Sequence, residues 1–364
     1  MLLRMLSPSR WTGIVLLSAS GALHMASAQS KDSSASQSPP VTIGGYVDSY
    51  FSYNFDRPKS RVNELRNFDV GEDQFVMSTA EVTVQKAAAP VGFRVDLDFG
   101  PANDIVQSGV SGSIADLRQA YITYVIPVGS GLTVDAGKFV THCCFEVIPA
   151  KDNFNYSRSF LFAWSVPYYH VGARAAYAVS STLTLNGYVY NGWNGIVVNS
   201  GKTFGFEAAY SPSSAWSFVA NWLGGPALPD TVSKKFRNVA ELIASFQATD
   251  RLTIAANAVY GQEDLQGSIA LWKGVAGYLK YVLCDPSSIA IRGEIFSDPE
   301  GYMTLTPQDL KEVTFTYEYK PVASLILRGE YRYDWSNAVS FDSDTSPLAR
   351  KNQATLALAA IIVF

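Results

Sequence analysis

The residues whose types could support metal or redox chemistry are His142, Cys143, Cys144 and His170. Zinc sites usually space their cysteines two to four residues apart, whereas the two cysteines here are adjacent, so we predict no metal site. The third cysteine, Cys284, falls in a predicted tight turn. A disulfide needs Cα atoms within about 7 Å, so we expect no bridge between Cys284 and the adjacent pair unless the loop that carries the pair extends far toward this turn.

Catalytic chemistry finds little support in the sequence. A serine hydrolase needs a histidine within reach of a nucleophile and an orienting acid. His170 could be assigned the role of that histidine, but it fits better as a residue that hydrogen-bonds a loop to the neighbouring strands. The chain contains no P-loop, GxGxxG or HExxH motif. We therefore predict no catalytic residues, no cofactor and no enzymatic activity.

Charged side chains alternate with apolar ones along several segments, most clearly in SLILRGEYRYDWS at 324–336. Alternation with a period of two is typical of a strand with one face in an apolar medium and the other in a polar medium. The charged positions that we predict to line a pore are Arg328, Glu330, Arg332 and Asp334, together with Arg94, Asp96, Asp98, Arg292, Glu294 and Glu318. A soluble sheet would turn these charges outward, and a membrane barrel would turn them inward.

The composition favours a membrane barrel. Only 16% of the 364 residues are charged, against about 25% in an average soluble domain, and the chain has 20 Tyr, 20 Phe and 7 Trp. No run after the N-terminal segment approaches the roughly 18 apolar residues of a membrane helix. The net charge of −4 gives no reason to expect a nucleic-acid partner.

The N-terminus has the features of an export signal. Arg4 and Arg10 precede a short apolar segment, and Ala26-Ser27-Ala28 is a small-residue cleavage site. We predict a signal peptide over 1–28, a disordered periplasmic leader over 29–41, and a barrel over 42–364.

Sixteen candidate strands follow, and the lengths of their connections alternate between short and long. We place the strands at 42–55, 73–86, 91–99, 116–127, 131–140, 169–179, 182–193, 202–211, 215–223, 236–248, 251–261, 269–283, 287–297, 309–320, 324–335 and 351–364. Bacterial barrels have short periplasmic turns, long extracellular loops and an even strand number. The sequence thus predicts an all-β, transmembrane, antiparallel up-and-down barrel of about 16 strands, wide enough for an aqueous channel. A soluble sandwich is the distant alternative.

The last residues, ATLALAAIIVF, place Leu358, Ala360, Ile362 and Phe364 on one face. This ending resembles the C-terminal insertion signal of bacterial outer-membrane barrels. The resemblance implies the outer membrane of a Gram-negative-type envelope as the location, with its lipid bilayer and the barrel-assembly machinery as partners. A buried final strand of a soluble sheet could end in the same way.

The longest connection contains NFNYSRSFLFAWSVPYYHVG at 153–172, and the chain also contains GGYVDSYFSYNFDRP at 44–58, DLRQAYITY at 116–124 and GKF at 137–139. Together these segments resemble the OmpL-like β-barrel porin-2 family of outer-membrane proteins over most of the chain. One departure stands out. Cys143-Cys144 occupies a place before Glu146 where we expect Gly or another small residue.

This third long loop follows the fifth strand, where general porins fold a loop into the barrel. The resemblance implies the same here, with Asn155, Ser157 and His170 anchoring the loop. Arg158 is our candidate for a constriction charge, because a guanidinium in a narrow lumen acts on passing ions with little screening. The equally weighted alternative is that Arg158 pairs with a wall carboxylate such as Asp96 or Asp98 and only staples the loop.

These features predict a porin that passes small hydrophilic solutes and ions by diffusion, with mild ion selectivity because charges of both signs line the lumen. The competing hypothesis is a non-conducting barrel that acts as an adhesin or surface-binding scaffold through its long loops. A homotrimer is an open alternative to a monomer, since no residue marks a subunit contact.

Overall fold

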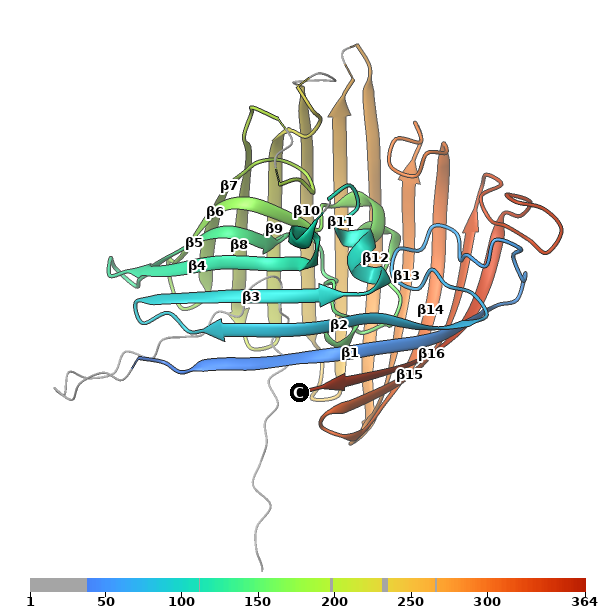
Figure 1. The fold of residues 1–364 in the computed structure, drawn as a ribbon, viewed down its shortest axis with the longest axis horizontal. Coiled ribbons are helices and arrows are strands. Elements are labelled where there is room, and N and C mark those ends of the chain that lie inside the picture. Colours follow the sequence, from blue (N-terminus) through green and yellow to red (C-terminus); the bar gives the residue numbers. More distant parts are fainter. Residues whose placement is uncertain (1–37, 111, 197–198, 231–234, 266) are drawn as a thin grey trace, which may run out of the picture.

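The structure is a computed structural model that describes residues 38–110, 112–196, 199–230, 235–265 and 267–364. The predicted signal peptide and most of the predicted leader lie outside these residues. Across the described residues, sixteen antiparallel strands form one closed barrel in which β1 pairs with β16 and every other strand pairs with its neighbours in sequence. Figure 1 shows the first strand, in blue, lying beside the last, in red.

The strands are β1 (Val41–Asn54), β2 (Gln74–Lys86), β3 (Val91–Phe99), β4 (Leu117–Ile126), β5 (Leu132–Val140), β6 (Tyr169–Ala178), β7 (Leu183–Tyr190), β8 (Thr203–Ser213), β9 (Trp216–Pro226), β10 (Phe236–Gln247), β11 (Leu252–Asp264), β12 (Ile269–Cys284), β13 (Ser287–Asp298), β14 (Gln308–Val322), β15 (Leu325–Ser336) and β16 (Asn352–Val363). The fold class predicted from alternation and loop order is therefore confirmed. The long loops carry short helical turns that alternation does not predict: α1 (Pro101–Val106), η1 (Ser113–Asp116), η2 (Ala150–Asp152) and η3 (Leu161–Ser165). Within the described part of the chain, no helix is long and apolar enough to cross a membrane.

The two faces of each strand differ in the way that alternation predicts. In β14, Thr314 is fully buried while its neighbours Val313 and Phe315 are exposed by 43% and 44%. The charged positions of SLILRGEYRYDWS lie on the inner face of β15, and Tyr331 lies on the outer face. Because the outer face carries apolar and aromatic side chains along the barrel, it suits contact with lipid.

The seam between the first and last strands includes the end of the chain. Phe364 exchanges two backbone hydrogen bonds with Gly45, at 3.0 and 3.1 Å, and its side chain is exposed. A Cβ atom at Gly45 would lie 2.1 Å from the Glu81 carbonyl oxygen and 2.7 Å from the Phe364 ring. Glycine at position 45 therefore allows the final ring to lie against the β1–β2 pair. Leu358, Ala360 and Ile362 share the exposed outer face of β16.

Candidate functional site

The third long loop, residues 141–168 between β5 and β6, lies inside the barrel, and we call it L3. Phe160, Leu161 and Phe162 of L3 are almost completely buried, and they share one apolar cluster with inward residues of β10–β14. A loop enclosed in this way must find hydrogen-bond partners for its backbone other than bulk water. The barrel wall supplies many of these partners, as predicted for an inward-folding loop.

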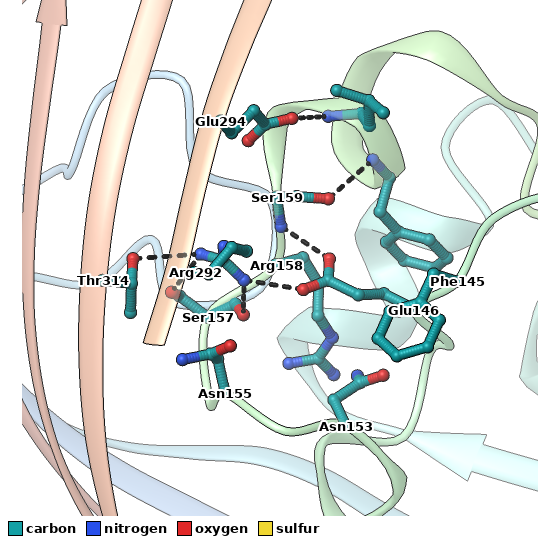
Figure 2. A network of polar contacts seen from close by, with 12 residues as sticks. Phe145, Glu146, Asn153, Asn155, Ser157, Arg158, Ser159, Arg292, Glu294 and Thr314 are labelled. Carbon is teal, nitrogen blue, oxygen red and sulfur yellow. Dashed lines mark hydrogen bonds and ion pairs between the residues drawn. The ribbon is translucent and has the colours of Figure 1, made fainter. Parts of the chain in front are cut away.

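Two wall carboxylates hold the middle of L3 by its backbone. Glu330 of β15 accepts the N–H groups of Tyr156 at 2.6 Å and Ser157 at 2.9 Å. Glu294 of β13 accepts the N–H groups of Phe160 and Leu161, both at 2.6 Å. Each carboxylate therefore satisfies two successive donors, an arrangement that orders the backbone as well as binding it. Figure 2 shows Glu294 against the loop backbone.

Arginines of the same wall hold the carbonyl groups of L3. Arg292 donates to the Ser157 carbonyl at 2.8 Å and pairs with Glu146 of the loop at 2.7 Å (Figure 2). Arg328 donates to the carbonyls of Ala150 at 2.7 Å, Asn153 at 2.8 Å and Asn155 at 3.2 Å. Arg332 donates to the Arg158 carbonyl at 2.5 Å.

The three predicted anchoring residues all make contacts of this kind. Asn155 donates to the Thr316 hydroxyl of β14 at 2.7 Å, and the Ser157 hydroxyl accepts from Arg292 at 3.0 Å. His170, at the start of β6, lies 3.2 Å from the Thr141 hydroxyl and stacks on the Tyr190 ring with centroids 3.8 Å apart.

The first part of L3 is held from a neighbouring part of the wall, β9 to β11, by residues that are not among the predicted site residues. The Cys144 N–H donates to Glu241 of β10 at 2.8 Å, and the Phe145 N–H donates to Asn257 of β11 at 3.3 Å. Asn221 of β9 donates to the His142 carbonyl at 3.1 Å. All three wall residues occupy inward positions of their strands, so an analysis of strand faces could have found them.

Cys144 has a φ of 87°, in the left-handed region that favours glycine. This backbone conformation accounts for the Gly or other small residue that we expect at this point of the loop.

Both adjacent thiols are buried, and burial raises the pKa of Cys143 and of Cys144 far above the ordinary value. Across the described residues, no group of three or more His, Cys, Asp or Glu side chains is arranged to hold a metal ion.

His142 is enclosed at the base of L3. Its ring stacks on Tyr188 of β7 with centroids 4.1 Å apart, and it is 1% exposed. Burial lowers the pKa of His142 from 6.5 to about 3. The imidazole is therefore neutral at physiological pH.

Arg158 lies within L3, and its side chain is directed at the loop itself. The guanidinium donates to the carbonyls of Val147 at 3.2 Å, Tyr156 and Ile148, and it lies over the Phe68 ring at 4.6 Å. The alternative that Arg158 pairs with Asp96 or Asp98 is wrong.

Those two carboxylates lie instead against Arg118 of β4, at 2.9 and 3.1 Å, and Glu81 joins the same cluster. Arg118 is the extra residue of a β-bulge in β4, because its neighbours Leu117 and Gln119 pair with the successive residues Leu97 and Asp96 of β3. Because a bulge breaks the period of two, alternation does not predict that Arg118 points inward.

The predicted pore-lining charges all lie on the inner face, but few of them reach water. Arg292, Glu294, Arg328, Glu330, Arg332 and Asp334 are buried beside L3 or the first loop, and Asp96 and Asp98 are buried with Arg118. Arg94 is the exception among them, with a side chain that is 31% exposed. At the level of L3, the charged wall therefore serves mainly to hold the loop.

A closed sixteen-stranded barrel with a polar interior and an inward third loop defines a porin-type protein of the outer membrane. The family model described as "Putative beta-barrel porin-2, OmpL-like" matches residues 40–364, and the chain belongs to this family. It is therefore a porin located in the outer membrane.

Solved structures with the same fold are remote in sequence. The anion-selective porin from Comamonas acidovorans has a TM-score of 0.64 at 9% identity, covering 89% of this chain and 99% of that one. The outer-membrane channel DcaP of Acinetobacter baumannii has a TM-score of 0.57 at 14% identity, with 91% and 99% covered. The trimer form of OmpT of Vibrio cholerae has a TM-score of 0.58 at 11% identity, with 90% and 100% covered. No curated protein matches the chain.

Proposed function

We propose that this porin passes small hydrophilic solutes and ions by passive diffusion, and that L3 sets the size limit. The observation that carries the proposal is the position of L3 inside the barrel, held by wall residues from Asn221 of β9 to Glu330 of β15. Barrels of about sixteen strands enclose an aqueous lumen, and a loop fixed across that lumen narrows it. The channel needs no cofactor and no catalytic group.

Reconstitution tests this proposal. The purified protein in planar bilayers should give stepwise conductance, and liposomes containing it should swell in sugars up to a size limit. A heat-modifiable barrel that never conducts and admits no sugar would favour the competing hypothesis, in which the long loops act as an adhesin or a surface-binding scaffold.

We further propose that the chain is inserted by the barrel-assembly machinery and that it assembles as a homotrimer. The exposed outer face of β16 that ends in Phe364 supports the first part. The second part is supported by one of the structural matches, which is described as a trimer form. Mass measurement of the detergent-solubilised protein by light scattering distinguishes a trimer from a monomer.

A further inference from the structure

Inside the barrel, most charged side chains of either sign are buried, Arg118, Arg292 and Arg332 among them, and two lysines stand apart from this pattern. The carboxylates of Asp96, Glu312 and Asp334 are fully buried, and Glu81 and Asp98 are nearly so. Lys280 and Lys320, by contrast, have inward side chains that are 23% and 42% exposed. Acidic and basic side chains are nearly equal in number along the wall. The charges that are exposed to a passing solute are therefore not balanced in the same way.

Both lysines belong to one cluster around Glu318 of β14, which we call the Glu318 cluster. The Lys280 ammonium lies 3.5 Å and the Lys320 ammonium 3.3 Å from the same oxygen, Oε1 of Glu318. Arg328 donates to the other oxygen, Oε2, at 2.6 and 2.9 Å. Three cations thus surround one carboxylate, and the ion pairs within the cluster leave an excess of two positive charges.

The members of the cluster differ in their spare hydrogen-bonding capacity. Arg328 is 1% exposed, and it is already bonded to Glu318 and to three carbonyls of L3. Each lysine ammonium has three donors and shares Glu318 with the others, so it keeps donors for a further acceptor. Since both ammonium groups lie close to one oxygen, they are less than about 7 Å apart, a span that one oxyanion can bridge.

The position of the cluster places it on the route of a solute. Lys280 lies near the end of β12, and the Lys320 N–H donates to the carbonyl of Pro286 in the tight turn between β12 and β13. Tight turns mark the periplasmic side of a bacterial barrel. The Lys280 ammonium also lies 5.3 Å from the ring of Phe154 in L3. The cluster therefore faces the periplasmic half of the lumen, next to the loop that narrows it.

We propose that Lys280 and Lys320 form a binding site for small oxyanions, either carboxylates or phosphate, and that this site makes the channel prefer anions. The proposal rests on the proposed diffusion channel and deepens it. A weak, solvent-accessible site concentrates its ligand at the narrow part of a channel and still releases it.

The test compares Lys280→Gln/Lys320→Gln with Arg251→Gln, which removes an exposed charge in the β10–β11 turn. In a KCl gradient the wild type should prefer chloride. The double variant should shift toward cations by roughly twofold or more at 0.1 M salt, because a unit charge about 7 Å from an ion in water acts with an energy near RT. Arg251→Gln and the charge-preserving Lys280→Arg/Lys320→Arg should match the wild type.

Succinate and inorganic phosphate, added separately, identify the oxyanion. One or both should reduce the wild-type KCl current to a saturating limit, and the double glutamine variant should need several-fold more of it. A cation-selective wild type, or a double variant with unchanged selectivity and unchanged block, overturns the proposal. If no current passes at all, the diffusion channel is the part that fails, and calorimetry with succinate and phosphate on the folded, detergent-solubilised barrel still decides the site. Heat-modifiability on gels confirms that each variant is folded.

Discussion

The carboxylate of Glu330 and the N–H of Tyr156 lie 2.6 Å apart although 174 residues separate them in the chain. Together with Glu294, which accepts two further N–H groups, this contact fixes L3 to one wall of the barrel. Hydrogen bonds to a charged group contribute roughly 1.5–3 kcal/mol each, so these carboxylates decide how rigidly the loop spans the lumen.

Glu294→Gln/Glu330→Gln should loosen L3 and leave the strands of the barrel paired. Glutamine keeps the shape of the glutamate side chain but not its charge. We expect noisier and larger single-channel currents and a lower temperature of conversion to the unfolded gel band. Glu207→Gln is the matched control. Glu207 also lies on the inner face, but its hydrogen bonds go to Asn186 and Tyr188 of the wall and not to L3. Equal behaviour of the control and the double variant would remove the anchoring role.

Arg158→Glu should act mainly on stability. It leaves three loop carbonyls without their donor, and an unsatisfied buried polar group costs about 1–3 kcal/mol. Arg57→Glu, at a position with a 68% exposed side chain, should change the conversion temperature little. The reversal potential of both variants decides the constriction role that was predicted for Arg158. If Arg158→Glu folds normally and shifts selectivity toward cations while Arg57→Glu does not, that role is right.

Cys284 should be the one thiol that reacts in the folded protein. It is exposed at the end of β12, whereas Cys143 and Cys144 are buried in L3. A polyethylene-glycol maleimide should therefore add one label to the folded barrel and three after denaturation, visible as gel shifts. In cells, labelling should require a permeabilised outer membrane, because the turn after β12 is periplasmic. Labelling of intact cells would reverse the assigned orientation.

Cys144→Gly should be tolerated or stabilising, and Cys144→Val should destabilise the loop. The φ of 87° at this position is accessible to glycine at no steric cost, and it is strained for a β-branched residue by about 1–3 kcal/mol. The conversion temperatures of the two variants on gels provide the comparison. A stable valine variant would show that the loop does not need this conformation.

Acid should weaken the fold through His142. The unfolded chain takes up a proton at the ordinary pKa of 6.5, whereas the folded protein does so only near a pKa of about 3. Stability is therefore lost as the pH falls through this window, by up to ~2 kcal/mol at pH 5, and it is unaffected above the window. His142→Phe keeps a ring that can stack on Tyr188. The variant should show a smaller fall of the conversion temperature in acid than the wild type. Above pH 7 the conversion temperatures of the two proteins should change with pH in the same way. Identical acid profiles would show that His142 does not contribute.

The sequence predicted the barrel well because a period of two repeats along every strand. The largest displacements of predicted strand ends, three residues, occur at the ends of β7 (Leu183–Tyr190), β9 (Trp216–Pro226) and β11 (Leu252–Asp264). Side-chain partners inside the barrel were less predictable. Arg118 was missed because a bulge breaks the alternation, and the partners of Arg158 were wrong because loop conformation has no periodic signal. The face of a strand residue follows from its neighbours, whereas its partner depends on the path of a loop far away in the chain.

The path of L3 has a consequence for the order of folding. The loop follows β5, yet the side chains that hold its middle come from β13 (Ser287–Asp298) and β15 (Leu325–Ser336). Contacts between residues this distant in sequence form late, since a long loop must close before they can contribute. L3 can therefore reach its final position only after nearly the whole wall has been inserted, and a nascent barrel keeps a wider and wetter interior until its last strands arrive.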